Sequence, residues 1–270
     1  MPAKYILSKV LDEGVIYEAE SDKAYVIRRV GTNSTTAATF SVAGVNCLTI
    51  VDKVARISPS AYNPYGPLDL GTLFIVVPPS KKFGFKGEAG SKMYIEGEIL
   101  ELAPGEVLTP DLLARYAEQG KHYLSYLSGL FSKGTGVSWP ADEENAVIDY
   151  TVPAGEKHVI NRGVYADITG LAAPHAPGDW SLRFYKHGAP LDILSATMGD
   201  PGIDIWNMCY IYDTTVYHNL FSLEKMPIVL EPGRRLTIKA RNVSGAAKSP
   251  AAGASITVTA YLIDEVTLLG

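Results

Sequence analysis

Short runs of apolar, β-branched and aromatic residues recur along most of the chain, and several of them alternate with polar residues on a period of two. The clearest are residues 24–27, 39–42, 48–51, 73–77, 92–100 and 255–262. Gly, Pro, Asn and Asp separate these runs. Such a series of short, turn-bounded runs predicts β-strands packed into a sandwich or barrel.

One segment breaks this alternation and favours a helix. Thr109 is a suitable N-cap, Pro110 suits the first helical position, and Asp111 suits the positive end of the helix dipole. Residues 114–119 include good helix formers, and Gly120 is expected to end or bend the helix. Residues 121–131 fit either a second helical piece or a strand, and we favour the helix. A flexible linker is expected at 132–136.

Three pairs of segments indicate an internal repeat. Residues 17–27 align with 150–160, residues 77–83 with 230–236, and residues 92–100 with 255–263. The order of the three segments is the same in both halves, and so are their turn residues and strand phases. We therefore favour a tandem duplication of one β-domain over two unrelated β-domains with similar hairpins.

The predicted fold is all-β, with two tandem antiparallel β-sandwich domains of the jelly-roll type joined by a short helical linker. The expected boundaries are 1–108 for the first sandwich, 109–138 for the helical segment and linker, and 139–270 for the second sandwich. Early Pro-Ala-Gly and late Pro-Gly-Arg turns, at 153–155 and 232–234, fit an eight-stranded sandwich.

Composition and targeting features narrow the class of protein. The chain has 270 residues and a formal net charge of −5, which argues weakly against broad nucleic-acid binding. Cys47 and Cys209 lie in separate strand-like runs and are expected to be buried, reduced thiols. The N-terminus lacks the features of a signal peptide, and no apolar run approaches the ~18 residues of a membrane helix. We expect a protein made in a cytoplasm, without a membrane or a direct nucleic-acid partner.

The sequence contains no recognisable catalytic motif. The five His residues lack metal-ligand spacing, and His158 stands alone in its strand. The chain has no Gly-x-Ser-x-Gly, P-loop or dinucleotide motif. Isolated carboxylates are more often turn formers than glycosidase residues. We expect no enzyme activity, no metal and no cofactor.

The remaining signals concern contact surfaces. Tyr is frequent, with 16 residues against 7 Phe, and several lie in loops that suit contacts with proteins or sugars. The basic pairs at 81–82 and 234–235 occupy equivalent repeat positions; solvated strand starts explain them more simply than an acidic partner. The expected interface residues are Tyr62, Tyr65, Leu112, Leu113, Tyr116, Tyr123 and Leu127, although those after residue 108 also suit packing onto the chain's own sandwiches.

Tandem jelly-roll units with the turns at 153–155 and 232–234, an acidic composition and no active-site motif resemble virion structural proteins of tailed bacteriophages, of the head decoration (cement) or minor capsid type. The resemblance implies a homo-oligomer, often a trimer, that contacts the major capsid protein or other virion proteins and stabilises the shell after assembly in the host cytoplasm. The helical insert has no counterpart that we can place in this family. A carbohydrate- or receptor-binding module of a tail or fibre is the alternative, and a jelly-roll enzyme comes third.

Overall fold

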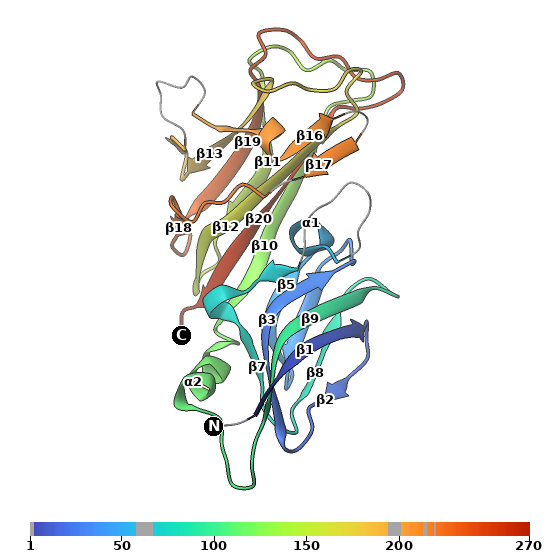
Figure 1. The fold of residues 1–270 in the computed structure, drawn as a ribbon. Coiled ribbons are helices and arrows are strands. Elements are labelled where there is room, and N and C mark those ends of the chain that lie inside the picture. The colour runs from blue at the N-terminus through green and yellow to red at the C-terminus, as the bar shows by residue number, and fades with distance from the viewer. Residues whose placement is uncertain (1–2, 58–66, 194–200, 213–214, 219) are drawn as a thin grey trace. The chain divides into compact units, whose positions relative to one another are not determined.

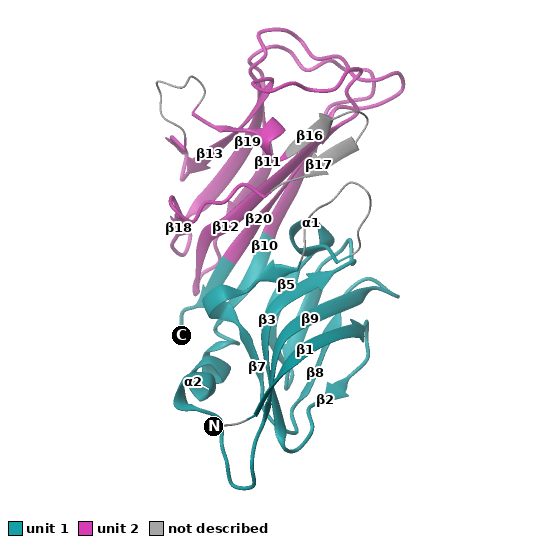
Figure 2. Ribbon diagram, viewed as in Figure 1, with its two compact units in different colours: residues 1–60, 65–126, 265–269 teal, residues 61–64, 127–264, 270 magenta. Residues whose placement is uncertain are grey.

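The computed structural model describes residues 3–57, 67–193, 201–212, 215–218 and 220–270. The chain is all-β, with mainly antiparallel sheets, as the alternating pattern predicts (Figure 1). It divides into two compact units (Figure 2). Unit 1 contains residues 1–60, 65–126 and 265–269, and unit 2 contains residues 61–64, 127–264 and 270.

Unit 1 consists of two sheets with a shared core. In the first sheet, β1 (Ala3–Asp12) pairs with β9 (Lys92–Glu101), β9 with β3 (Lys23–Thr32), and β3 with β6 (Leu68–Asp69) and β7 (Ile75–Val77). The second has the order β2 (Tyr17–Glu18), β8 (Lys82–Lys86), β4 (Ala38–Val42) and β5 (Val45–Ile50). The rings of Tyr25 and Phe83 meet edge to face across the two sheets at 5.7 Å between centroids, so aromatic packing stabilises this core.

Within the described residues of unit 1, three short helical elements accompany these strands. They are α1 (Asp52–Ala55), a 3-10 turn (Gly71–Leu73) and α2 (Pro110–Glu118). Helix α2 begins after Thr109 as predicted, although the Thr109 side chain forms no capping hydrogen bond. Its Leu112 and Tyr116 pack on a second cluster around Val26, Val76 and Leu100. Strand β3 is therefore buried on both of its faces.

Unit 2 repeats this arrangement. One sheet has the order β18 (Ile228–Leu230), β12 (Glu156–Thr169), β20 (Thr257–Leu268) and β10 (His122–Ser132). The other has β11 (Glu144–Thr151), β19 (Arg235–Asn242), β13 (Trp180–Lys186) and β14 (Ala189–Leu191), with β15 (Ile203–Asp204) also paired to β13. A 3-10 turn (Ile205–Asn207) and the hairpin of β16 (Cys209–Tyr212) and β17 (Thr215–His218) lie between β15 and β18.

The strand order is the same in both units. When the eight principal strands of each are numbered along the chain, one sheet has the order first, eighth, third, sixth, and the other has second, seventh, fourth, fifth. This is jelly-roll topology, present twice. The three repeat segments seen in the sequence fall on the second and third, the sixth and seventh, and the eighth strands of both rolls.

The segment 121–131 is a strand, so the helical interpretation is wrong. Leu127 and Phe131 pack against the core of unit 2 at strand spacing. Gly129 between them lies where an added Cβ would be 2.1 Å from the Val147 carbonyl oxygen. Gly, Ser and aromatic residues are weak helix formers. The alternation of more and less buried side chains along the segment is that of a strand. The segment 109–138 therefore supplies the first strand of the second jelly roll, in addition to α2.

Candidate interaction surface

Strand β1 is an exposed edge of the first sheet in unit 1. It pairs along all ten residues with β9, and the described part of the chain gives it no strand on its other side. Only Leu7 and Leu11 of β1 are buried. Ile6 is 84% exposed, Tyr5 53% and Val10 50%. A long, apolar, unpaired edge strand is a template for pairing with another chain.

The exposed residues of β1 are complementary to the same strand running in the opposite direction. An antiparallel pairing centred on Ser8 places Ile6 opposite Val10 and Lys4 opposite Asp12, each pair occurring twice. Residues 4, 6, 8, 10 and 12 share one face because strand side chains alternate. Within the chain, Lys4 pairs with Glu98 at 3.1 Å and Asp12 with Lys92, yet the side chains of Lys4 and Asp12 stay more than half exposed.

Lys9 is the feature of β1 that opposes such pairing, because a charge on the inner face of an edge strand usually discourages association. Its ammonium lies 4.6 Å from the centroid of the Tyr17 ring. This contact holds the charge against an aromatic surface of the same unit. The opposite face of β1, which carries Ile6 and Val10, keeps its apolar contact area.

The structure places the interface residues that the sequence predicts in different environments. Leu112 and Tyr116 pack partly buried against the cluster around Val76, and Leu127 packs against the core of unit 2. Leu113 is exposed and lines an open pocket of about 850 Å³ together with Ala3 and Val107. Tyr123 is half-buried. Tyr62 and Tyr65 lie outside the described residues.

Sequence reasoning missed β1 as a surface. The signal available was the run Tyr5-Ile6-Leu7, in which three consecutive apolar residues place apolar side chains on both faces of a strand. An edge strand covers only one of its faces with a core, so the other face is left in solvent.

The sequence suggested that His158 stands alone, but the structure gives its ring two acidic partners. Its Nδ1 lies 2.5 Å from Oδ2 of Asp264 and its Nε2 lies 2.8 Å from Oε2 of Glu156. Burial lowers the pKa of His158, but the hydrogen bonds and charges of Asp264 and Glu156 outweigh it and raise the pKa above its ordinary value. His158 is 3% exposed. A substrate has no access to this ring, so the cluster fits a structural ion pair better than a catalytic site.

The two carboxylates bind opposite nitrogens of the His158 ring and do not converge on one point. Among the described residues, no group of three or more His, Cys, Asp or Glu is arranged to hold a metal ion. The helices in the same part of the chain are too short or too polar to span a membrane.

Comparison with family models and with curated proteins finds no match. Among solved structures, the chain is similar to one titled as the STIV MCP, with a TM-score of 0.37, 8% identity, and 97% and 96% coverage of this chain and that one. The major capsid protein P2 from bacteriophage PM2 matches with a TM-score of 0.29, 10% identity and 98% coverage of both chains.

A cupin 2 conserved barrel domain protein from Leptotrichia buccalis matches with a TM-score of 0.19 and 12% identity, over 97% of this chain and 85% of that one. The chain is thus similar to two viral capsid proteins and to a cupin.

Proposed function

We propose that this chain is a structural protein of a virus particle, without catalytic activity, that assembles with copies of itself and contacts other virion proteins to decorate or stabilise the shell. The observation that carries the proposal is the exposed, self-complementary edge of β1. A protein that is monomeric in solution normally protects such an edge strand with charged residues, a proline, a bulge or a covering segment.

The tandem fold supports the same reading by analogy. Jelly rolls present broad, rigid faces and serve as viral capsid domains as well as lectin and cupin domains. Two rolls in one chain double the surface available for contacts, and linked contacts gain avidity. Fold alone does not specify function, so the proposal depends on the behaviour of the β1 surface.

The test is the mass of the purified full chain in solution across a concentration series, measured by light scattering after size exclusion, with electron microscopy for larger assemblies. We expect oligomers, and we expect Ile6→Lys to shift them toward the monomer. Leu130→Lys, at an exposed leucine of unit 2, is the matched control and should leave the mass unchanged.

A monomer at every concentration, with no ordered assemblies, would remove the basis of the proposal. A trimer that Ile6→Lys leaves intact would support self-assembly through a surface other than β1.

A further inference from the structure

The outer face of β8 in unit 1 carries a pocket of about 350 Å³. The β4–β8 pairing places Ser41 opposite Gly84 and Thr39 opposite Lys86. Lys82 shares this face because side chains alternate along a strand. The pocket therefore has small hydroxyl side chains and a glycine at its centre, with one exposed lysine at each end.

The hollow depends on Gly84. A Cβ at this position would lie 2.6 Å from the Val15 carbonyl oxygen, so the loop at 13–16 can cross here only over a glycine. The Gly14 N–H donates to the Phe85 carbonyl at 3.1 Å and fixes that loop in place. The loop also adds the exposed Ile16 as an apolar wall.

The two lysines of the pocket, Lys82 and Lys86, are not engaged in ion pairs with the described residues. Glu18 is the cross-strand neighbour of Lys82, but no ion pair joins them. The Ser41 hydroxyl likewise forms no hydrogen bond with this part of the chain.

Unit 2 provides an internal comparison, because β19 is the equivalent of β8. Lys82 and Lys86 correspond to Arg235 and Lys239 at the repeat offset of 153 residues. Arg235 binds both carboxylate oxygens of Asp149, and Lys239 pairs with Glu144 at 2.9 Å. The basic residues of β19 are thus neutralised within the unit.

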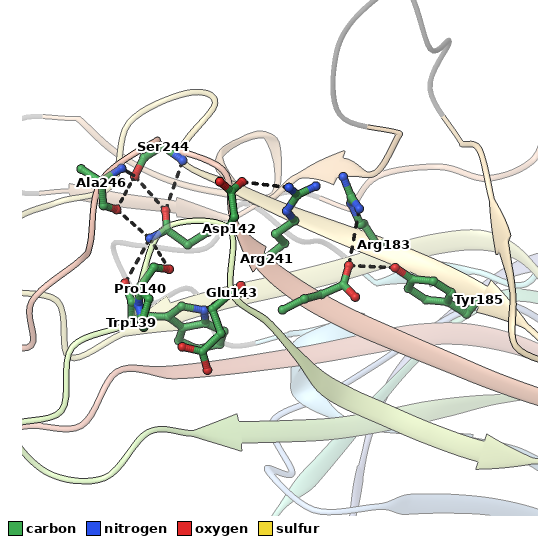
Figure 3. Close-up of polar contacts among 11 residues, drawn as sticks. Trp139, Pro140, Asp142, Glu143, Arg183, Tyr185, Arg241, Ser244 and Ala246 are labelled. Atoms are coloured by element: carbon green, nitrogen blue, oxygen red, sulfur yellow. Dashed lines mark hydrogen bonds and ion pairs between the residues drawn. The ribbon is translucent and has the colours of Figure 1, made fainter.

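The centre of this face is also filled in unit 2. Thr237 stands in place of Gly84, and the β13–β19 pairing places Tyr185 and Arg183 where unit 1 has Ser41 and Thr39. The Tyr185 hydroxyl donates to Glu144 at 2.8 Å, and Arg183 contacts the same carboxylate at 3.6 Å (Figure 3). In unit 2 this strand position is filled by side chains with paired charges, whereas in unit 1 it lies under the loop at 13–16 and borders a hollow whose two lysines form no ion pair with the described residues.

We infer that the pocket formed by Lys82, Lys86, Ser41 and Gly84 binds an anionic sugar, a monosaccharide unit that carries a carboxylate or a phosphate. The lysines match the negative charge, the free Ser41 hydroxyl matches sugar hydroxyls, and Ile16 offers an apolar surface to the sugar ring. The inference goes beyond the proposed assembly function and does not depend on it.

The experiment titrates the full chain with N-acetylneuraminic acid, glucuronic acid and glucose 6-phosphate, with glucose and inorganic phosphate as comparison ligands, followed by ligand-observed NMR and calorimetry. The two carboxylate sugars and the phosphate sugar distinguish the source of the charge. We expect at least one anionic sugar to bind with a dissociation constant of about 1 mM or lower, with weaker binding at high salt.

Two variants test the site itself. Lys82→Gln/Lys86→Gln should weaken binding at least tenfold, and Ser41→Tyr, which introduces the residue of unit 2, should block the pocket without altering its charge. Lys121→Gln/Lys225→Gln removes two exposed lysines outside the pocket and should leave binding unchanged. Circular dichroism verifies that each variant is folded.

Three outcomes would overturn the inference. The first is no binding of any anionic sugar at millimolar concentration. The second is binding that survives both pocket variants. The third is inorganic phosphate or glucose binding as tightly as the anionic sugars.

Discussion

The side chain of Gln119 forms a two-way hydrogen-bonded pair with the main chain of Val76. The Val76 N–H donates to Oε1 of Gln119 at 3.0 Å, and Nε2 of Gln119 donates to the Val76 carbonyl at 3.1 Å. Gln119, the residue after α2, is 1% exposed. It satisfies the main chain of β7 as a neighbouring strand would, and it therefore couples the end of α2 to the sheet of unit 1.

We expect Gln119→Ala to destabilise unit 1 by about 2–4 kcal/mol, because it leaves a buried N–H and a buried C=O without partners. Cys47 reports this change: it lies buried in unit 1, and burial raises its pKa to about 12. In a Cys209→Ser background, thiol labelling of Cys47 should accelerate at least tenfold. Glu118→Ala, on the exposed side of α2, should leave the labelling rate near that of the parent.

The ion pair of His158 and Asp264 predicts a pH-dependent stability of unit 2. The raised pKa of His158 means that its contribution is complete below the unfolded pKa of about 6.5 and is lost as the pH rises through the folded pKa. His158→Gln keeps an amide that can donate to Asp264 but does not titrate. Its deficit in unfolding free energy relative to the parent should be largest near pH 5.5 and should shrink toward pH 9.

Tryptophan fluorescence measures this unfolding without interference from unit 1, because Trp139, Trp180 and Trp206 all belong to unit 2. Denaturant titrations at several pH values give the free energies. A deficit that stays constant across the pH range would show that protonation of His158 is not coupled to folding.

Asn242 joins three segments at one end of unit 2. Its Nδ2 lies within 3.1 Å of the carbonyl oxygens of Trp139, Pro140 and Ala246, and its Oδ1 accepts from the main chain and hydroxyl of Ser244 (Figure 3). Asn242 also begins an Asn-x-Ser pattern for glycosylation. Its complete burial makes it a structural residue and leaves no access for modification.

We expect Asn242→Asp to lower the unfolding free energy of unit 2 by about 2–4 kcal/mol, since it removes the donor and brings a carboxylate against buried carbonyl oxygens. Ser244→Ala, which keeps the amide, should cost about 1 kcal/mol or less. Fluorescence-detected denaturation separates the two. Equal losses would contradict the role of the Asn242 amide as the joining group.

The duplication is visible in the sequence because turns and strand phases are local. The segments 17–27 and 150–160 fall on equivalent strands for this reason. Pairings between distant strands are not local, and the basic residues of the two rolls illustrate the difference. Lys82 and Arg235 look equivalent, but only the folded chain shows that Asp149, 86 residues away, neutralises Arg235.

The same limit applies to His158, whose partner Asp264 follows 106 residues later. The secondary structure of β10 was predicted wrongly for another reason. Leu127 and Phe131 are four residues apart, a spacing that puts both side chains on one face of either a helix or a strand. Only the neighbours of Gly129 decide between the two.

The antiparallel register of β1 can be tested by charge exchange between copies. In a pairing centred on Ser8, Lys4→Glu brings two acidic residues together at each end, and Asp12→Lys brings two basic residues together. Each variant alone should therefore associate about 2- to 30-fold more weakly than the parent, from two cross-strand pairs of about 0.2–1 kcal/mol each.

A mixture of the two variants should associate again, because the introduced glutamate of one copy then faces the introduced lysine of the other, while the opposite end keeps the native Lys4 and Asp12. Native mass spectrometry with one variant isotope-labelled counts mixed and unmixed pairs, and added salt should reduce the preference. The intrachain ion pair of residue 4 with Glu98 or of residue 12 with Lys92 is lost in each variant, and mixing the variants does not restore it. Recovery of association in the mixture therefore measures only the contact between copies. Mixed pairs no more frequent than unmixed ones would exclude this register while leaving association through Ile6 and Val10 open to a different alignment.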